Sequence, residues 1–349
     1  MSPAEVLRRM GGAMRFATWV PILALSGSLL WANSSSAEQL YLDAQFGFTR
    51  TSEVLFASKP VGDPAVDMDL YLELFQPTGP GAPDPAPAVI LVHGGGFVSG
   101  DRNNATLIEL CEGLADRGYV CVSIDYRLAG DDPVIGAAFS VIENLASNVS
   151  GGATAEAVAA SVEDSVAAYQ YLIANKETLG VDPQRIGIGG SSAGGTAAFL
   201  AGYLLADIGV LPKGAFKTVL TMWGGFGSNF GAFIDADDPR LILLHGDEDE
   251  VSPIANVDAL AESAAEASLL NEIYVLAGFK HGFNIFTREV ATGRTAFDAI
   301  VDFFYVHVAS AGAPSVPVLG LPGRLLLGSL IGFSAVVGVS PLRKFIRRN

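Results

Sequence analysis

Short apolar runs separated by longer helical patterns dominate the middle of the chain. Apolar residues fill 88–92, 119–124, 185–188 and 241–244 almost without interruption, as they do in parallel strands that are covered on both faces. This alternation predicts right-handed crossovers and an α/β fold with a mostly parallel, doubly wound sheet. The stretches between and after these runs have the spacing of helices, and the predicted helices are 104–117, 154–179, 193–206, 254–269 and 295–309.

One strand near the start of this region has a different pattern. Apolar and polar residues alternate from Asp67 to Leu74, which predicts an antiparallel strand with one exposed face. Residues 77–87 contain five prolines and therefore predict a loop. The pattern contains no internal repeat and no second core, so we expect one α/β domain over residues 38–310.

The N-terminal end differs from this middle region. Residues 1–37 carry three arginines at positions 8, 9 and 15, continue with the apolar stretch Phe16–Ala32 and end with the small residues Ser35–Ala37. This order is typical of a secretory signal peptide. We therefore predict that residues 1–37 are a signal peptide and that the protein is exported. A membrane anchor that is never cleaved is the alternative.

The C-terminal end, residues 311–349, is the second atypical segment. Leu325–Val339 is an uncharged run of 15 residues, and four basic residues follow it. As a helix these residues would span only ~22 Å, against the ~30 Å of a hydrocarbon core. A span becomes feasible if the helix continues to Leu342 and Arg324 snorkels. We predict a transmembrane anchor whose basic end is cytoplasmic, and this tail is the only membrane contact that we expect.

Composition narrows the remaining function classes. The chain has 21 Lys and Arg against 37 Asp and Glu, a net charge of −16, which disfavours nucleic-acid binding. Half of the residues are hydrophobic, so a mainly disordered chain is excluded. Cys111 and Cys121 are the only cysteines. A disulfide between them is permitted in an exported protein, and two packed thiols are the alternative.

The first motif with chemical meaning is Gly190–Gly194, read as Gly-Ser-Ser-Ala-Gly between an apolar run and an alanine-rich helix. Small residues around a serine allow a tight strand-to-helix turn that exposes the hydroxyl group. The start of the helix adds unpaired N–H groups and a positive dipole end. The motif therefore makes Ser192 a candidate nucleophile, and a glycine-rich packing turn is the alternative.

The second motif is His93–Phe97, with three glycines directly after the apolar run 88–92. Glycines let backbone N–H groups face a cavity without an intervening side chain. Acyl transfer needs such donors where negative charge develops on the substrate oxygen. A phosphate-binding loop is the alternative, but the glycine and lysine spacing that such loops need is missing here.

Two later loops offer partners for the serine. The turn His245–Glu250 contains four consecutive acids, and it lacks the alternating ligand pattern of an EF-hand calcium loop. The chain has four histidines, and three of them lie in the glycine loop, in this acidic turn and in an apolar helix. His281, in a loop after a short predicted strand at 272–276, is therefore the candidate general base.

Together these motifs resemble the α/β-hydrolase superfamily, close to its carboxylesterase and hormone-sensitive-lipase-like branches, over about residues 60–308. The segments Ser123–Leu128 and Leu179–Ile186 are also similar to that family. The resemblance implies an α/β-hydrolase fold and the family's order of nucleophile, acid and base. The end of the chain separately resembles a bacterial PEP-C-terminal type sorting tail, which is the alternative to a plain anchor for residues 311–349.

The resemblance assigns roles to individual residues. It implies that Ser192 is the nucleophile, that His281 is the base and that Asp249 is the acid, with Asp247 as the second candidate for the acid. The amides that would bind the oxyanion are those of Gly95, Gly96 and Ala193.

The expected protein is an exported serine hydrolase, periplasmic, on the cell surface or secreted, that cleaves small-molecule carboxylic esters through an acyl-enzyme. This chemistry needs no metal and no organic cofactor. Residues 129–152 are the candidate for a small lid, and a small or missing cap favours short to medium acyl groups. An aromatic set is a candidate lining of the acyl pocket: Trp223, Phe226, Phe230 and Phe233. A catalytically silent adhesion protein and a peptidase of the same fold are the alternatives.

Overall fold

The computed structural model describes residues 40–146, 153–227, 230–310 and 344–346. The chain divides after Glu38 into two units, and all described residues belong to the second unit, Gln39–Asn349. The predicted signal peptide and nearly all of the predicted tail lie outside the described residues, so both stay predictions. Within the described ranges, no helix combines the length and the apolar character needed to cross a membrane.

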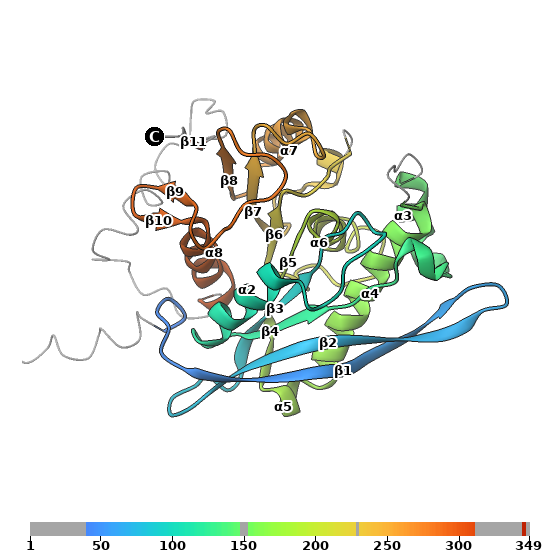
Figure 1. Ribbon diagram of the computed structural model, residues 1–349, viewed down its shortest axis with the longest axis horizontal. Coiled ribbons are helices and arrows are strands. Elements are labelled where there is room, and N and C mark those ends of the chain that lie inside the picture. Colours follow the sequence, from blue (N-terminus) through green and yellow to red (C-terminus); the bar gives the residue numbers. More distant parts are fainter. Residues whose placement is uncertain (1–39, 147–152, 228–229, 311–343, 347–349) are drawn as a thin grey trace, which may run out of the picture. The chain divides into compact units, whose positions relative to one another are not determined.

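The described chain is built on a nine-stranded sheet with the order β1-β2-β4-β3-β5-β6-β7-β8-β11 (Figure 1). The pairs β1–β2 and β2–β4 are antiparallel, and every pair from β4 to β11 is parallel. The strands are β1 (Gly47–Val61), β2 (Val66–Thr78), β3 (Ala86–Val92), β4 (Val120–Ile124), β5 (Val181–Ser191), β6 (Thr218–Met222), β7 (Arg240–Gly246), β8 (Asn271–Leu276) and β11 (Lys344–Ile346).

Helices cover both faces of this sheet, and alternate strand residues enter two separate cores. In β3, Ile90 and Val92 belong to one hydrophobic cluster, whereas Val89 and Leu91 belong to the other. The first cluster includes α4 (Ala155–Ala174), α6 (Ala193–Tyr203) and α7 (Ile254–Glu266), and the second includes α2 (Ala105–Ala115) and α8 (Ala296–Phe304). The predicted α/β fold with a mostly parallel, doubly wound sheet is therefore confirmed.

Smaller elements complete the described part. They are the 3-10 turns η2 (Ala129–Asp131), η3 (Ala137–Phe139) and η4 (Phe230–Phe233), the short helices α3 (Ser140–Leu145) and α5 (Lys176–Leu179), the hairpin of β9 (Glu289–Ala291) and β10 (Arg294–Thr295), and the π-helical turn η5 (Tyr305–Ala309). The single helix expected over 154–179 is instead α4 followed by α5, with Asn175 between them. The helix expected over 295–309 changes to π geometry after Phe304.

Five strands were not predicted from the sequence: β1, β6, and the short strands β9, β10 and β11. One loop is also shorter than expected. β1 has a single buried residue, so it carries no core-facing alternation. β6 is fully buried but short, and two of its five residues are threonine. The loop expected over 77–87 is shorter, because β2 continues to Thr78 and β3 begins at Ala86.

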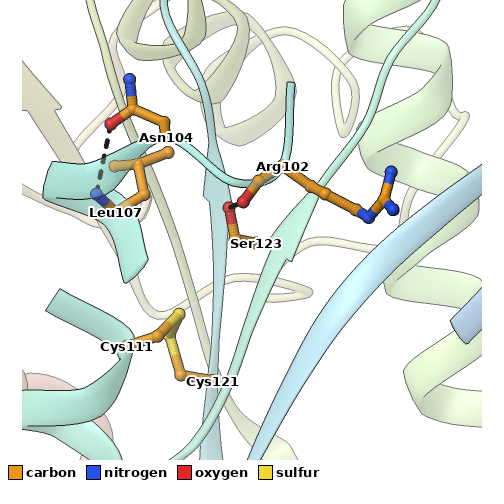
Figure 2. Close-up of a disulfide and its surroundings, with 6 residues drawn as sticks. All are labelled: Arg102, Asn104, Leu107, Cys111, Cys121 and Ser123. Carbon is orange, nitrogen blue, oxygen red and sulfur yellow. Dashed lines mark hydrogen bonds between the residues drawn. A yellow bond between two sulfur atoms is a disulfide. The ribbon is translucent and has the colours of Figure 1, made fainter. Parts of the chain in front are cut away.

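A disulfide joins Cys111 in α2 to Cys121 in β4, with 5.1 Å between the two Cα atoms. Both cysteines are fully buried. A second link lies nearby, because Ser123 Oγ donates a hydrogen bond to the carbonyl oxygen of Arg102 at 2.7 Å (Figure 2). β4 is thus linked both to α2, through the disulfide, and to the segment that connects the glycine loop to α2, through Arg102.

Arg127 connects the start of the predicted lid to the rest of the domain. Its guanidinium is fully buried and forms ion pairs with Glu163 and Asp164, both at 2.8 Å. The same group donates to the carbonyl oxygens of Val134 at 2.8 Å and Pro60 at 3.1 Å. The hydrogen bonds and ion pairs of Arg127 therefore connect β1, α4 and the segment after η2 to one another.

Candidate active site

Ser192 occupies the sharp turn between β5 and α6. Its backbone angles are φ 52° and ψ −122°, and a positive φ at a residue other than glycine costs on the order of 1–3 kcal/mol. The surrounding backbone holds this conformation, because Ser192 N–H donates to the carbonyl oxygen of Met222 at 2.8 Å. Glycine is required next to it: a Cβ on Gly194 would lie 2.0 Å from the carbonyl oxygen of Val92.

His281 lies in the loop after β8 and reaches the serine. Its Nε2 is 2.8 Å from Ser192 Oγ. On the other side of the ring, Nδ1 is 2.8 Å from Asp249 Oδ2. A carboxylate only accepts hydrogen bonds, so Nδ1 carries the proton and Nε2 is the acceptor for the serine hydroxyl. The imidazole is therefore oriented with its basic nitrogen toward the candidate nucleophile.

Asp249 is buried in the turn after β7. Its Oδ1 accepts hydrogen bonds from the backbone N–H groups of Val251 and Ser252, both at 2.8 Å. The second candidate for the acid, Asp247, serves a different purpose, because its Oδ1 accepts the N–H of Gly278. Of the two carboxylates, only Asp249 contacts the histidine, so the structure brings Ser192, His281 and Asp249 together.

The glycine loop approaches the serine turn closely. A Cβ on Gly94 would lie 3.0 Å from Ser192 Cβ, so this contact requires glycine. Gly95 and Gly96 have φ values of 121° and 64°, which favour glycine. No described residue accepts a hydrogen bond from the backbone N–H of Gly95 or of Gly96. Ala193 is the first residue of α6, where backbone N–H groups have no partner within the helix.

His93 belongs to the framework of this loop. Its Nδ1 donates to the carbonyl oxygen of Gly94 at 2.7 Å, and its ring stacks on Tyr126 with 4.2 Å between the ring centroids. Burial lowers the pKa of His93. His307 is likewise removed from the serine, packed against Phe303 with its pKa lowered to about 4 by burial. Both histidines are therefore structural, in agreement with their sequence contexts.

The four aromatic residues suggested for the acyl pocket divide into two groups. Phe226 and Phe230 pack against Phe199 of α6, with ring centroids 5.4 and 5.8 Å apart. Phe233 packs beside Phe230, so this group belongs to the core on that face. Trp223 alone lies beside the base loop, where it contacts Phe283 edge-on at 4.9 Å. The three phenylalanines pack in the core on that face, and their suggested role in the acyl pocket stays a prediction.

The acidic turn has no sign of a cation site. Within the described residues, no group of three or more His, Cys, Asp or Glu side chains is arranged to hold a metal ion.

Comparison with known proteins agrees with this architecture. The BD-FAE family model matches residues 68–143 and 149–210. An AB hydrolase superfamily protein of Schizosaccharomyces pombe is 31% identical over 135 residues, covering 38% of this chain and 32% of that protein. Esterase LipC of Mycobacterium tuberculosis is 25% identical over 290 residues, covering 71% of this chain and 64% of LipC. The chain thus spans less than two thirds of the length of these curated relatives.

A solved structure has the same fold. An esterase of the planctomycete Thermogutta terrifontis, with propionate bound, superposes with a TM-score of 0.55 at 21% identity and covers 76% of this chain and 96% of that one. The fold and the sequence matches together show that this chain has the α/β-hydrolase fold and is similar to members of the α/β-hydrolase superfamily. The relatives that it matches include a carboxylesterase and several esterases.

Proposed function

We propose that this protein is a serine carboxylesterase with Ser192 as nucleophile, His281 as general base and Asp249 as the acid that orients the base. One observation carries the proposal. A continuous path of two 2.8 Å contacts runs from Ser192 Oγ through both ring nitrogens of His281 to Asp249 Oδ2. It lies beside glycine-loop amides that have no other described acceptor.

The proposed reaction has two acyl-transfer steps. His281 Nε2 removes the proton of Ser192 as Oγ attacks the ester carbonyl carbon, and the carbonyl electron pair moves onto oxygen. The tetrahedral intermediate then expels the alcohol, which takes its proton from Nε2–H. Water attacks the acyl-serine with the same base, and the carboxylic acid leaves. Asp249 stabilises the imidazolium that forms in both steps.

The oxyanion of each intermediate needs preorganised donors. The amides of Gly95, Gly96 and Ala193 are the proposed donors, and removal of one such donor typically costs about 10²- to 10³-fold in rate. Three amides at one end of the sheet also avoid the need for a metal ion as Lewis acid.

Short to medium acyl groups are the proposed substrates. The Thermogutta esterase has been seen with propionate bound and with butyrate bound, and the described part of the predicted lid, 129–146, contains only η2, η3 and the six-residue α3. A small cover of this kind supports small acyl groups over long buried chains.

The test compares the full chain with Ser192→Ala on p-nitrophenyl esters from acetate to palmitate and on a peptide amide. We expect turnover that depends on Ser192 and is highest for short to medium esters. Equal background rates in both proteins would favour a silent adhesion protein, and faster amide cleavage would favour a peptidase. An optimum at palmitate would overturn the proposed acyl range.

Export is part of the proposal. The Cys111–Cys121 disulfide supports a mature protein in an oxidising compartment, since such bonds are rare in the cytosol. We propose that residues 1–37 are removed as a signal peptide and that 311–349 serve as an anchor or sorting tail. Mass spectrometry of the mature protein from a bacterial host tests this, and we expect it to begin at Glu38. A cytosolic protein with an intact N-terminus would contradict export.

A further inference from the structure

His245 contacts the turn 249–252, which carries the acid Asp249 and is called the acid turn below. It takes no part in the proton transfers described above. It is at the end of β7, and its side chain is fully buried. Its Nε2 is 2.7 Å from the carbonyl oxygen of Ser252 and 3.3 Å from Asp249 Oδ2. Both neighbours are acceptors, so Nε2 carries a proton, which it donates to the Ser252 carbonyl oxygen, while the Asp249 carboxylate is a close electrostatic neighbour.

The surroundings of the other ring nitrogen, Nδ1, indicate that the His245 imidazole is uncharged. His245 Nδ1 is buried and has no hydrogen-bond partner among the described residues. A second proton there would bury a charge without an acceptor, which is costly. Burial accordingly lowers the pKa of His245, against the opposing influence of Asp249. The ring is therefore a neutral donor.

The contacts of His245 complete the surroundings of the acid. Asp249 Oδ1 is held by the N–H groups of Val251 and Ser252, and Oδ2 faces His281 Nδ1. His245 Nε2 holds the carbonyl oxygen of Ser252 and lies 3.3 Å from Oδ2. Ser252 thus links the histidine to the carboxylate, because its N–H donates to Asp249 Oδ1 and its carbonyl oxygen accepts from His245.

We propose that His245 is a positioning residue, whose neutral imidazole locks the turn 249–252 through the Ser252 carbonyl oxygen and so keeps Asp249 Oδ2 facing His281 Nδ1. This inference rests on the proposed function of the same site. A neutral donor is suited to this position, because a lysine or arginine would place a second positive charge near His281 and oppose formation of its imidazolium.

The backbone around His245 keeps the acid turn in register with the base loop. The next residue, Gly246, has no room for a side chain, because its Cβ would lie 2.1 Å from the carbonyl oxygen of Phe279. That same oxygen accepts the N–H of Glu248 at 2.9 Å. The end of β7 is thus pressed against the loop that carries His281, so a small shift of Asp249 is transmitted directly to the base.

The test uses His245→Leu and His245→Gln in the full chain. Leucine removes the donor, whereas the glutamine amide keeps an N–H donor for the Ser252 carbonyl oxygen. We expect His245→Leu to lower kcat by about tenfold, the size of one lost buried hydrogen bond, with KM nearly unchanged. His245→Gln should restore most of kcat. Titration with an organophosphate that labels Ser192 normalises kcat to folded, competent enzyme.

A spectroscopic measurement separates positioning from a packing role. The far-downfield proton resonance of His281 Nδ1–H reports its hydrogen bond to Asp249, and it should shift in His245→Leu and return in His245→Gln. Equal kcat and an unshifted resonance in the leucine variant would overturn the inference, as would equal impairment in both variants. His245→Phe replaces the leucine variant if that one does not fold, with the same expected loss.

The two proposals fail in different ways. Absence of Ser192-dependent ester turnover in the unmutated protein would overturn the proposed function. The resonance of His281 Nδ1–H would still show in that case whether His245 affects the hydrogen bond between His281 and Asp249. Wild-type activity in His245→Leu would overturn only the positioning role.

Discussion

The two halves of the candidate site are held in place by different means. On the nucleophile half, at the ends of β3 and β5, backbone presses on backbone. A Cβ on Gly194 would meet the carbonyl oxygen of Val92 at 2.0 Å, and Ser192 is kept at a positive φ. On the acid half, after β7, backbone amides and the His281 side chain hold Asp249 through hydrogen bonds.

This difference predicts which changes each half tolerates. The turn around Ser192 depends on the absence of side-chain volume. An added methyl group should therefore disturb this turn more than a change of charge would. The acid turn depends on which atoms accept and donate, so an isosteric change that alters one oxygen should be enough to disable it. Gly246 is the exception on the acid half, because it is also closely packed against Phe279.

The largest effect is expected from Asp249→Asn. The amide can no longer act as a charged acceptor for His281 Nδ1–H, so the histidine loses its preferred tautomer and the stabilisation of its imidazolium. By analogy with the same change in other triads, kcat should fall about 10⁴-fold. Steady-state assays with a short p-nitrophenyl ester measure kcat, while circular dichroism checks that the fold is retained.

Asp247→Asn is the matched control for that variant. It lies two residues away, and asparagine keeps the oxygen that accepts the N–H of Gly278. Activity near that of the unmutated protein is the expected result. A loss as large as that of Asp249→Asn would mean that the acid had been assigned to the wrong carboxylate.

Gly194→Ala is the next largest change, and it acts on folding instead of chemistry. The new methyl group would lie 2.0 Å from the Val92 carbonyl oxygen and 2.5 Å from that of His93, so β3 and α6 would have to separate. We expect a loss of about 3 kcal/mol or more in the free energy of unfolding, or a fall in Tm of about 6–12 °C.

Gly130→Ala provides the control, because a Cβ there meets nothing within 4 Å. Its Tm should stay close to that of the unmutated protein. Similar Tm values for Gly194→Ala and Gly130→Ala would show that the serine turn can accommodate volume, and the contrast between the two halves would fail.

The parts of the molecule that could be predicted from the sequence are those whose residue types indicate one local structure. The buried strands and the serine turn have local signatures, because apolar runs and clustered glycines reflect contacts that the local chain itself requires. β1 has no such signature, since only one of its residues is buried. β6 was missed because its threonines interrupt the apolar run.

Contacts that depend on tertiary packing and turn geometry could not be read in the same way. The Cys111–Cys121 bond depends on how α2 packs on β4, and that packing fixes the 5.1 Å Cα separation. The proximity of His245 to Asp249 depends on a turn that folds back on the end of β7. Sequence placed His245 in an acidic turn, but only the three-dimensional arrangement shows which oxygen atoms it reaches.

The smallest effect on chemistry is expected from removal of the disulfide. Cys111→Ala combined with Cys121→Ala removes a cross-link over 10 residues, for which loop-closure entropy gives about 3 kcal/mol of stability. The Tm should fall by about 6–12 °C. Activity at a temperature well below this Tm should be nearly unchanged, because the glycine loop and serine turn are held by their own backbone contacts.

The reduced, unmutated protein separates the cross-link from the packing of its sulfur atoms. It loses the covalent bond but keeps both buried side chains, so its Tm should lie between those of the oxidised protein and the double variant. If kcat instead fell with Tm in the reduced protein, the glycine loop would depend on the link from α2 to β4. The nucleophile half would then be held by a remote cross-link as well as by close contact, and the contrast with the acid half would have to be redrawn.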